Sequence, residues 1–311
     1  MAAKRSIYVV GSSNTDMVIR ASKLPAPGET VMGGDFLMNP GGKGANQAVT
    51  AARLGGEVTF VAKVGNDVFG KQAVRLFQRE NINTLYVVRD TSHPSGVALI
   101  NVDANGENCI AVAPGANSHL KALEVEASLE IMSDPAIILL QLEIPLNTVK
   151  YTIRRSFEKG LKVVLNPAPA QPLPDDIFSC IYLLTPNESG AELLTGVKVT
   201  DEESAKTAAT ILKERGLENV IITMGSKGAY LLTDTMSKLI ATPPVTAVDT
   251  TAAGDCFNGA LAVALAEDLP LDEAVTFACK AASICVTRMG AQASIPYRKE
   301  VDSLFLQTPL A

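Results

Sequence analysis

The residues best placed to carry out chemistry together lie in one short stretch. It consists of Asp249, Thr250, Thr251, Ala252, Ala253, Gly254 and Asp255. Apolar residues follow at helical spacing and predict an amphipathic helix directly behind it: Phe257, Ala260, Leu261, Ala264 and Leu265. Small residues at 252–254 allow main-chain N–H groups at the helix N-terminus to converge on an anion. Asp255 in the same turn can accept a proton, so the turn combines the two features that phosphoryl transfer to an alcohol requires. The competing interpretation is that Asp255 only caps the helix, and for this stretch taken alone the cap is the better interpretation.

A second candidate stretch is rich in glycine. It reads Asn39, Pro40, Gly41, Gly42, Lys43, Gly44, Ala45, Asn46, Gln47 and Ala48. It is similar to a phosphate-binding loop, but Gly44 stands where that motif needs Ser or Thr, so a P-loop NTPase is disfavoured. The glycine pair permits close approach of a ligand to the backbone. We expect Lys43 and Asn46 to point toward a polar ligand, although an ordinary tight turn is equally compatible with the sequence.

Polar residues also follow several apolar strands. Asn14 and Asp16 lie two residues apart after the first strand, so in extended chain their side chains share one side, as binding to neighbouring sugar hydroxyls would need. A plain turn is the alternative. Glu143 follows another strand, at the end where ligands bind in open α/β sheets. Gly11 is the only glycine of the first strand's loop, so the dinucleotide-binding fingerprint is absent and a Rossmann dehydrogenase is disfavoured.

Two later loops follow the same rule. Asn187 ends a strand and either faces a ligand or only caps the next helix. The glycine-rich turn from Thr223 to Gly228 ends another strand and contains Gly225 and Ser226.

These residues need a scaffold, and the pattern of elements predicts one. Short β-branched runs at 7–10, 58–64, 137–140, 162–165, 181–184 and 220–223 alternate with helical stretches at 45–54, 67–80, 120–132, 148–159, 202–215 and 256–267. Residues 278–286 are nearly all apolar or small and predict a buried helix. Gly55, Gly160 and Gly216 follow three of the helical stretches as stop signals. The fold class is therefore α/β, with a doubly wound, mostly parallel sheet flanked by helices.

Two segments interrupt this alternation. Residues 15–38 are strand-like but punctuated by Pro and Gly, and residues 95–112 contain Asn105-Gly106 between two strand-like runs, a hairpin signal. We expect them either to form one small β-sheet lid or to be two unrelated surface hairpins. The main α/β domain would then comprise 1–14, 39–94 and 113–311.

Composition limits the classes of function. Among 311 residues, Lys plus Arg is 27 and Asp plus Glu is 33, so the net charge of −6 argues against nucleic-acid or anionic-membrane partners. No apolar stretch approaches the length of a membrane span. The five cysteines form no CxxC pair, which favours reduced thiols in a cytoplasmic protein without a zinc site. A GxSxG motif is absent, so a serine hydrolase is also disfavoured.

Taken together, the motifs resemble the ribokinase (PfkB-type) carbohydrate kinase family over nearly the whole chain. The resemblance is carried by 41–47 and 249–255, with 14–16, 141–143, 166–169 and 185–188 in the expected order between them. It reverses the plain interpretations of Asp255 and of Asn14 with Asp16. It implies an α/β kinase domain whose β-sheet lid closes over the sugar and pairs with a second lid in a homodimer.

The resemblance also implies an activity, the ATP-dependent phosphorylation of D-ribose at O5. Asp255 would be the catalytic base, and the backbone at Ala252, Ala253 and Gly254 would form the anion hole. Ribose would be held by Asn14, Asp16, Gly42, Lys43, Asn46 and Glu143. The nucleotide would lie against Asn187, Thr223, Gly225, Ser226, Gly228, Gly254 and Cys279. Mg²⁺ would travel with ATP, and K⁺ would lie near Asp249, Thr251, Cys285, Arg288, Gly290 and Ser294. We expect the helix-terminal position to keep Asp255 ionised.

One residue departs from the family pattern. Gly190 stands where the family often has an acidic residue near Mg²⁺, so Glu188 or Glu192 would substitute, or affinity for the metal would fall. Two other functions stay open: a kinase for another sugar or a nucleoside, and a non-catalytic regulator that binds a sugar or a nucleotide on the same scaffold.

Overall fold

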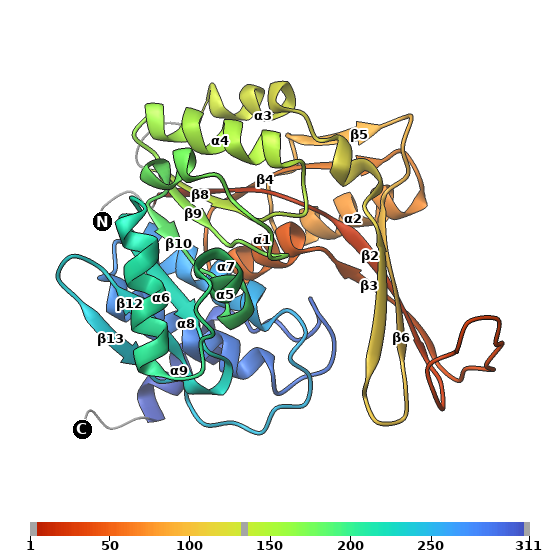
Figure 1. Cartoon of the computed structure of the whole chain (residues 1–311). Helices are drawn as coiled ribbons and strands as arrows, with labels where there is room; N and C mark the ends of the chain where they lie inside the picture. Colours follow the sequence, from red (N-terminus) through yellow and green to blue (C-terminus); the bar gives the residue numbers. More distant parts are fainter. Residues whose placement is uncertain (1–4, 132–135, 308–311) are drawn as a thin grey trace.

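The computed structural model describes residues 5–131 and 136–307, and a nine-stranded sheet runs through its centre (Figure 1). The strand order is β13-β12-β11-β10-β9-β8-β1-β4-β5. The bounds are β1 Ser6–Val10, β4 Val58–Gly65, β5 Val87–Asp90, β8 Ala136–Leu140, β9 Lys162–Leu165, β10 Leu183–Leu184, β11 Asn219–Thr223, β12 Ala229–Leu232 and β13 Ser237–Ile240. All pairs from β5 to β11 are parallel, and only the β11–β12 and β12–β13 pairs are antiparallel. The predicted α/β class with a mostly parallel sheet is confirmed.

The strand order reverses at β1. The chain passes from β1 to β4 and β5 on one side and later fills the other side with β8 to β11. Such a reversal opens a crevice at the carboxyl ends of the two central strands, where α/β proteins bind ligands. Residues 12–16 and 141–143 leave β1 and β8 at this crevice.

Helices cover both faces of the sheet (Figure 1). One layer contains α1 Lys43–Arg53, α2 Val68–Arg79, α7 Ala253–Ala266, α8 Leu271–Cys285 and α9 Arg298–Gln307. The other contains α3 Ala122–Leu129, α4 Leu146–Glu158, α5 Glu188–Thr195 and α6 Glu202–Glu214. Alternate strand residues enter the two cores: Val9 and Phe60 pack with the first layer, Val10 and Val61 with the second. Strands buried on both faces explain the continuous apolar runs in the sequence.

Three sequence expectations change in detail. The predicted helix 120–132 is shorter, because α3 ends at Leu129, and Met132 lies outside the described residues. The predicted strand 181–184 is reduced to Leu183–Leu184. The helix behind Asp255 is not amphipathic, since every residue from Asp255 to Ala266 is buried where α1 and α8 cover α7. The predicted stop glycines Gly55, Gly160 and Gly216 do adopt positive φ.

A second, four-stranded sheet projects from the main body (Figure 1). Its order is β3-β2-β6-β7, with β2 Asn14–Arg20, β3 Phe36–Gly41, β6 Gly96–Val102 and β7 Asn108–Ala113. The parallel β2–β6 pairing joins the two interrupting segments into one sheet, so the alternative of two unrelated hairpins is wrong. The domain boundaries, and the closing of this sheet as a lid, stay predictions.

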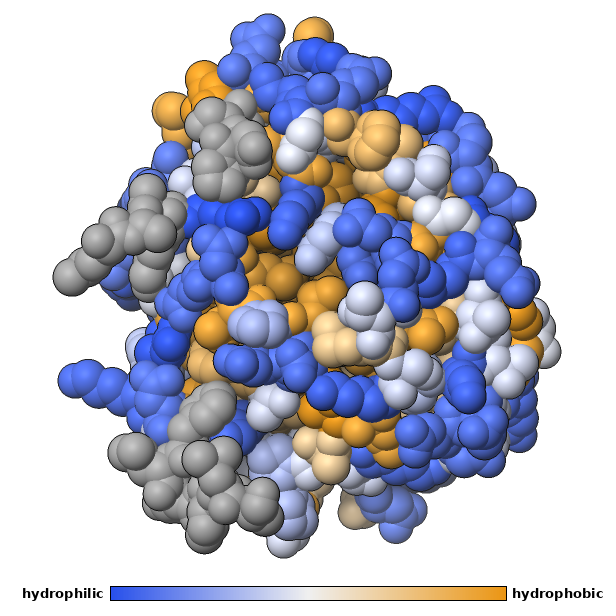
Figure 2. Space-filling view, turned by 90° about the vertical axis from the view of Figure 1, so that its left-hand side faces the viewer, coloured by the Kyte–Doolittle hydropathy of each residue, from blue (hydrophilic) through white to orange (hydrophobic). Residues whose placement is uncertain are grey.

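The outer surface of the main body is mainly polar on the face shown in Figure 2, where hydrophobic residues lie mostly in recesses between hydrophilic ones. Within 5–131 and 136–307, no helix combines the length and the apolar character needed to cross a membrane.

Candidate active site

The carboxylate of Asp255 lies at the centre of the site, in the first turn of α7. It is only 6% exposed. Asn46 Nδ2 donates to Asp255 Oδ2 over 2.9 Å, and Gln47 Nε2 donates to Oδ1 over 3.0 Å. The N-cap position of α7 belongs to Ala252, so Asp255 is not the helix cap that the plainer interpretation supposed. Two amides from α1 thus fix both oxygens of a buried acid.

Burial has the largest effect on the pKa of this acid. Burial raises the pKa of Asp255, while the charge of Lys43 and the hydrogen bonds from Asn46 and Gln47 lower it by less. The expectation that the helix-terminal position keeps Asp255 ionised stays a prediction, and the loss of water around the carboxylate raises its pKa against it. A raised pKa makes Asp255 a stronger proton acceptor once it is ionised.

The main chain in front of Asp255 offers free donors. Ala252 has φ 60°, a left-handed conformation that a residue with a Cβ seldom adopts and that often marks a functional turn. Ala253 N donates to Thr250 O over 3.2 Å. Within the part of the chain that the structure describes, the N–H groups of Ala252, Gly254 and Asp255 have no acceptor. Of the three predicted anion-hole residues, two therefore present unused N–H groups, while that of Ala253 makes a long internal bond.

Two further carboxylates lie close enough to act on Asp255. Burial, followed by the charges of Glu143 and Asp255, raises the pKa of Asp16 to about 6, and Lys43 opposes the shift. Glu143 Oε2 accepts from Ser12 Oγ over 2.5 Å and from Lys43 N over 3.0 Å. The crevice therefore concentrates negative charge around one lysine.

Gly41 allows Asp16 to occupy its position. A Cβ on Gly41 would lie 2.1 Å from Asp16 Oδ2 and 2.4 Å from its Cγ, distances that no side chain tolerates. The neighbouring Gly42 has φ 89°, and a Cβ on Gly42 would lie only 2.7 Å from Asn14 N. The glycine pair therefore lets the backbone of β3 pass directly under Asn14 and Asp16.

Asn14 is held by a residue from the short helix η1, Gly115–His119. Asn117 Nδ2 donates to Asn14 Oδ1 over 2.8 Å, and Asn117 Oδ1 accepts from Ser13 N over 2.9 Å. Asn117 is 1% exposed, so these bonds are shielded from water. The Asn14 amide is thus turned by a partner about a hundred residues away.

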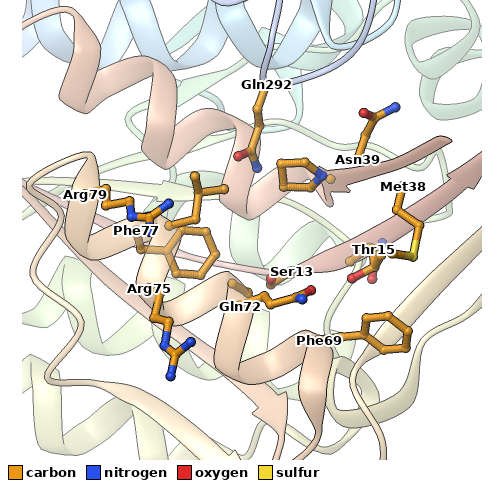
Figure 3. Close-up of a pocket in the computed structure, with 15 residues that line it drawn as sticks. Ser13, Thr15, Met38, Asn39, Phe69, Gln72, Arg75, Phe77, Arg79 and Gln292 are labelled. Atoms are coloured by element: carbon orange, nitrogen blue, oxygen red, sulfur yellow. The ribbon is translucent and has the colours of Figure 1, made fainter.

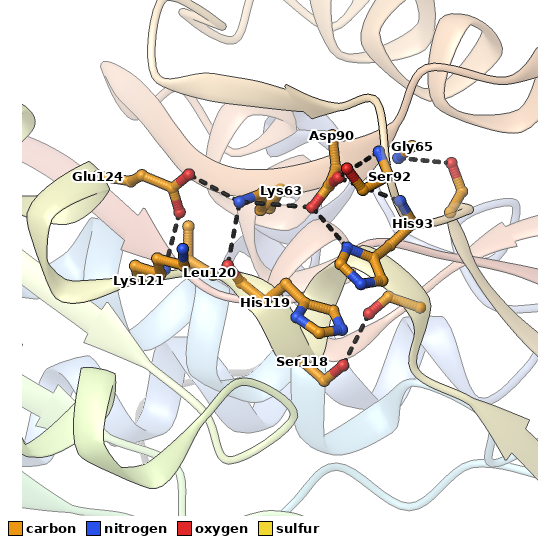
Figure 4. A network of polar contacts seen from close by, with 12 residues as sticks. Lys63, Gly65, Asp90, Ser92, His93, Ser118, His119, Leu120, Lys121 and Glu124 are labelled. Atoms are coloured by element: carbon orange, nitrogen blue, oxygen red, sulfur yellow. Dashed lines mark hydrogen bonds and ion pairs between the residues drawn. The ribbon is translucent and has the colours of Figure 1, made fainter.

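A buried lysine holds the end of this short helix (Figure 4). Lys63 Nζ donates to His119 O over 3.1 Å and to Glu124 Oε1 over 2.7 Å, and it lies 3.4 Å from Asp90 Oδ2. Hydrogen bonds from Ser92 N and from His93, with the charge of Lys63, hold the pKa of Asp90 well below its usual range. Lys63 belongs to β4. It therefore fixes the end of η1, and through Asn117 also Asn14, relative to the main sheet.

The residues predicted to line the nucleotide gather at neighbouring strand ends. Asn187 forms an isolated bridge with Thr223, at the ends of β10 and β11. Its side chain caps α5 by accepting from Gly190 N over 2.8 Å, so the cap interpretation is confirmed for Asn187 while its contact with a ligand stays a prediction. Gly225 and Gly228 have φ 55° and 107° in the following turn.

Cys279 lies on α8 and Gly254 on α7, and the contact of Cys279 with a nucleotide stays a prediction. Burial raises the pKa of the Cys279 thiol to about 12, so this cysteine is neutral and unreactive. Asn258 Nδ2 donates to Gly254 O over 2.8 Å, and its Oδ1 accepts from Thr185 Oγ1 over 2.6 Å. Asn258 therefore connects the anion-hole turn with the strand end that leads to Asn187.

The unusual Gly190 lies in the first turn of α5. A Cβ there would lie 2.9 Å from Asn187 Oδ1, so a larger residue would press on the cap oxygen. Of the two predicted substitutes, Glu188 is half-buried in the same turn and Glu192 is exposed. Their roles near a metal stay predictions.

The residues predicted around a monovalent cation lie on two segments, 249–251 and 285–294, that hydrogen bonds join. Asp249 Oδ1 accepts from Thr251 N over 2.9 Å, and Oδ2 accepts from Gly290 N over 2.8 Å. Burial raises the pKa of Asp249, but these hydrogen bonds together lower it by more, so the pKa is below its usual value. The guanidinium of Arg288 pairs with Glu300, which leaves only its main-chain carbonyl for an ion.

The chemistry of these two segments fits a hard cation, since an ionised carboxylate and main-chain carbonyls supply oxygen ligands. Cys285 Sγ lies 3.0 Å from Ser294 Oγ. Among the residues described, no group of three or more His, Cys, Asp or Glu side chains could hold a metal ion.

Sequence reasoning assigned no role to several residues that hold the site. Gln47 stands beside Asn46, and Asn258 follows Gly254 by one helical turn, so local spacing could have suggested both. Asn117 and Gln292 carried no such signal, because their partners Asn14 and Asn46 lie 103 and 246 residues away.

A buried carboxylate beside unused main-chain donors, at the switch point of a doubly wound sheet, defines a phosphotransferase that acts on an alcohol. Residues 4–298 match the model of the pfkB family carbohydrate kinases. The chain is 45% identical to the ribokinase of Haemophilus influenzae over 297 residues, which covers 96% of this chain and 97% of that protein.

Solved structures give the same result. The ribokinase of Thermotoga maritima has a TM-score of 0.89 at 41% identity and covers 97% of this chain and 100% of its own. The Arabidopsis thaliana ribokinase complexed with ribose and ATP has a TM-score of 0.90 at 31% identity, with 98% and 100% covered. The chain belongs to the pfkB family of carbohydrate kinases.

We expect the pKa of Asp16 in the free protein to be about 6, above its ordinary value of 3.8. Because the folded-state pKa is raised, this carboxyl contributes most to stability below pH 3.8, and the contribution is lost as pH rises to about 6. NMR titration of ¹³C-labelled aspartate measures it, with Asp16→Asn to assign the resonance. Glu143→Gln should lower the pKa by removing a like charge. A wild-type Asp16 that titrates at its ordinary pKa contradicts the prediction.

Gly41→Ala should displace Asp16 without unfolding the protein. The new methyl group takes the place of the Asp16 carboxylate, which moves because it ends a flexible side chain. We expect KM for the sugar to rise about ten- to hundredfold, as for misplaced binding groups in general, with little change in Tm. Gly34→Ala is the matched control, since its Cβ meets only Arg20 O at 3.9 Å. Equal KM values for the two variants would refute the contact.

Proposed function

We propose that this chain transfers the γ-phosphoryl group of ATP to O5 of D-ribose and releases D-ribose 5-phosphate. The observation that carries the proposal is the pair formed by Asp255 and the unused N–H groups of Ala252 and Gly254. The names of the relatives support the substrates, because one similar ribokinase structure holds both ribose and ATP.

In this proposal ribose lies between the base of the small sheet and α1. Asn14, Asp16, Gly42, Lys43, Asn46 and Glu143 would surround it. Carboxylates accept hydrogen bonds from hydroxyl groups, so the electronegative crevice around Asp16 and Glu143 suits a polyol. Lys43 would donate to a hydroxyl oxygen and offset part of the negative charge. Asn46 already donates to Asp255, so its main task would be to hold the base.

Asp255 would orient the O5 hydroxyl and accept its proton late in the transfer. The transition state of phosphoryl transfer is loose, so the alcohol does not need early deprotonation. Asn46 and Gln47 keep both carboxylate oxygens in place. The raised pKa favours acceptance of the proton at the moment when the new O–P bond forms.

The transferred phosphoryl group would lie against the N-terminus of α7. Negative charge on its oxygens is stabilised by the main-chain donors at 252–254 and by the helix dipole. ATP would lie along Asn187, Thr223, Gly225, Ser226, Gly228 and Cys279. Mg²⁺ bound to its phosphates would neutralise part of their charge. Glu188, which is half-buried in the first turn of α5, is the carboxylate that would lie near this ion.

A potassium ion would order the loop behind the anion hole. Asp249, Thr251 and the carbonyls of the 285–294 loop would hold it, and the hydrogen bond from Gly290 N to Asp249 already joins the two segments. Its effect would be structural, since Thr251 directly precedes Ala252.

The small sheet would form a homodimer through its outer face. Side chains alternate along β2, so Met17 and Ile19 lie on the face opposite Asp16. Their cross-strand partners are Met38, Leu99 and Phe36. Ile19, Phe36, Met38 and Leu99 are 42% to 56% exposed, an apolar row that a second copy of the sheet would cover.

Asp255→Asn should lower kcat by roughly 10²–10⁴-fold, the usual contribution of a general base, with a much smaller change in ribose affinity. A coupled assay of ADP release measures it. Asp272→Asn is the matched control, because Asp272 lies in the first turn of α8 yet is far more exposed. A turnover near that of the wild type would refute Asp255 as the base.

The same assay tests the substrate, run with and without KCl on ribose, deoxyribose, fructose, adenosine and pseudouridine. Ribose should give the highest kcat/KM. A higher value for another compound overturns the substrate, and no turnover of any compound favours the binding regulator.

Leu99→Glu should convert the dimer to a monomer, because it buries a charge in the apolar row. Light scattering coupled to gel filtration measures the mass. Leu123→Glu, at an 80% exposed position on α3, is the control that should leave the mass unchanged. A wild type that is already monomeric would refute the interface.

A further inference from the structure

A cavity lies beside the site, between α2, the first residues of β2 and the last residues of β3 (Figure 3). Its volume is about 340 Å³, at the lower end of the range for small-molecule pockets. In Figure 3, Gln292 and Asn39 lie on one side of it, and Gln72 and Arg75 lie on the other. Of the residues proposed for the sugar and the nucleotide, only Asn14 is among those that line this cavity.

A buried acceptor without a partner lines this cavity. Gln292 is 3% exposed, and its Nε2 donates to Asn46 Oδ1 over 3.2 Å. Its Oε1 has no hydrogen-bond partner among residues 5–131 and 136–307. A buried polar atom left unpaired is costly and calls for an explanation. This oxygen is closed to water in the free protein, so it can accept from a ligand in the cavity only after the Gln292 side chain turns toward it.

Two free cations line the same cavity. Arg75 and Arg79 are exposed and lie four residues apart on α2, so they share one side of the helix. Neither guanidinium has an ion pair or a hydrogen bond to the described part of the chain. By contrast, Arg154 and Arg155 on α4 are paired with Asp176 and Glu126. Two unpaired guanidinium groups on one wall are suited to a phosphate.

We propose that this cavity binds a small phosphate ester that carries hydroxyl groups. Its phosphate would lie on Arg75 and Arg79, and a hydroxyl would donate to Gln292 Oε1 once that side chain has turned toward the cavity. Gln292 also holds Asn46, and Asn46 holds Asp255, so an occupant would be sensed at the catalytic carboxylate through two hydrogen bonds. The product of the proposed reaction belongs to this chemical class. The inference rests on the cavity residues and holds whichever sugar is the substrate.

Calorimetric titration tests the proposal. The enzyme is first titrated with ribose and saturated with a non-hydrolysable ATP analogue, then titrated with ribose 5-phosphate or with inorganic phosphate. We expect the phosphate ester to bind the wild type, and to bind R75Q/R79Q about tenfold more weakly or worse, as for lost hydrogen bonds to a charged group. K71Q/R89Q carries the same charge change at exposed positions outside the cavity and should bind as the wild type does. The wild type should bind ribose 5-phosphate more tightly than inorganic phosphate. In Gln292→Leu, the two affinities should become similar.

Equal affinity in the wild type and R75Q/R79Q would place the ligand elsewhere and overturn the proposal, as would the absence of binding to the wild type. Failure of the proposed function appears separately, as the absence of ribose binding in the first titration. The comparison between R75Q/R79Q and K71Q/R89Q remains valid in that case.

Discussion

The hydrogen bonds from Asn46 and Gln47 to Asp255 are the contacts on which the site depends. They join the first turn of α1 to the first turn of α7, more than 200 residues away. A buried carboxylate with an unpaired oxygen would cost about 1–3 kcal/mol or more, so these two turns are stable only side by side. The backbone of residues 252–254, the proposed anion hole, precedes Asp255 directly, and its position follows from the same contacts.

The small residues of both helices make this approach possible. A Cβ on Gly259 would lie 2.5 Å from Thr50 Cβ and 2.7 Å from Gln47 O, so α7 packs against α1 at a distance that only glycine allows. Ala45, Ala48 and Ala260 are completely buried in the same contact. The alanine and glycine content of these stretches therefore serves the geometry of Asp255 as well as the packing of the core.

The fold could be predicted because its signals are local. Apolar runs marked β1, β4, β8 and β9 nearly to the residue, and their ends identified where polar groups would gather. The predicted residues Asp16, Glu143 and Asp255 do come close enough to shift the pKa of Asp16. Their partners could not be predicted, since Asn117 and Gln292 meet the site only through the tertiary fold. The raised pKa of Asp255 could not be predicted for the same reason: the helix terminus is visible in sequence, whereas burial by α1 and α8 is not.

The free site is electrostatically unfavourable, and this has a functional consequence. Asp16, Glu143 and Asp255 repel one another, and Lys43 is the cation that opposes them in the shifts of both aspartates. A polyol that donates hydroxyl hydrogens to these carboxylates stabilises their ionised forms, because hydrogen bonds to the charged form lower the pKa. Binding of the sugar would then lower the pKa of the base, while ATP hydrolysis without a sugar would meet a base whose pKa is still raised. The cost of gathering like charges in one crevice is thus coupled to substrate selection.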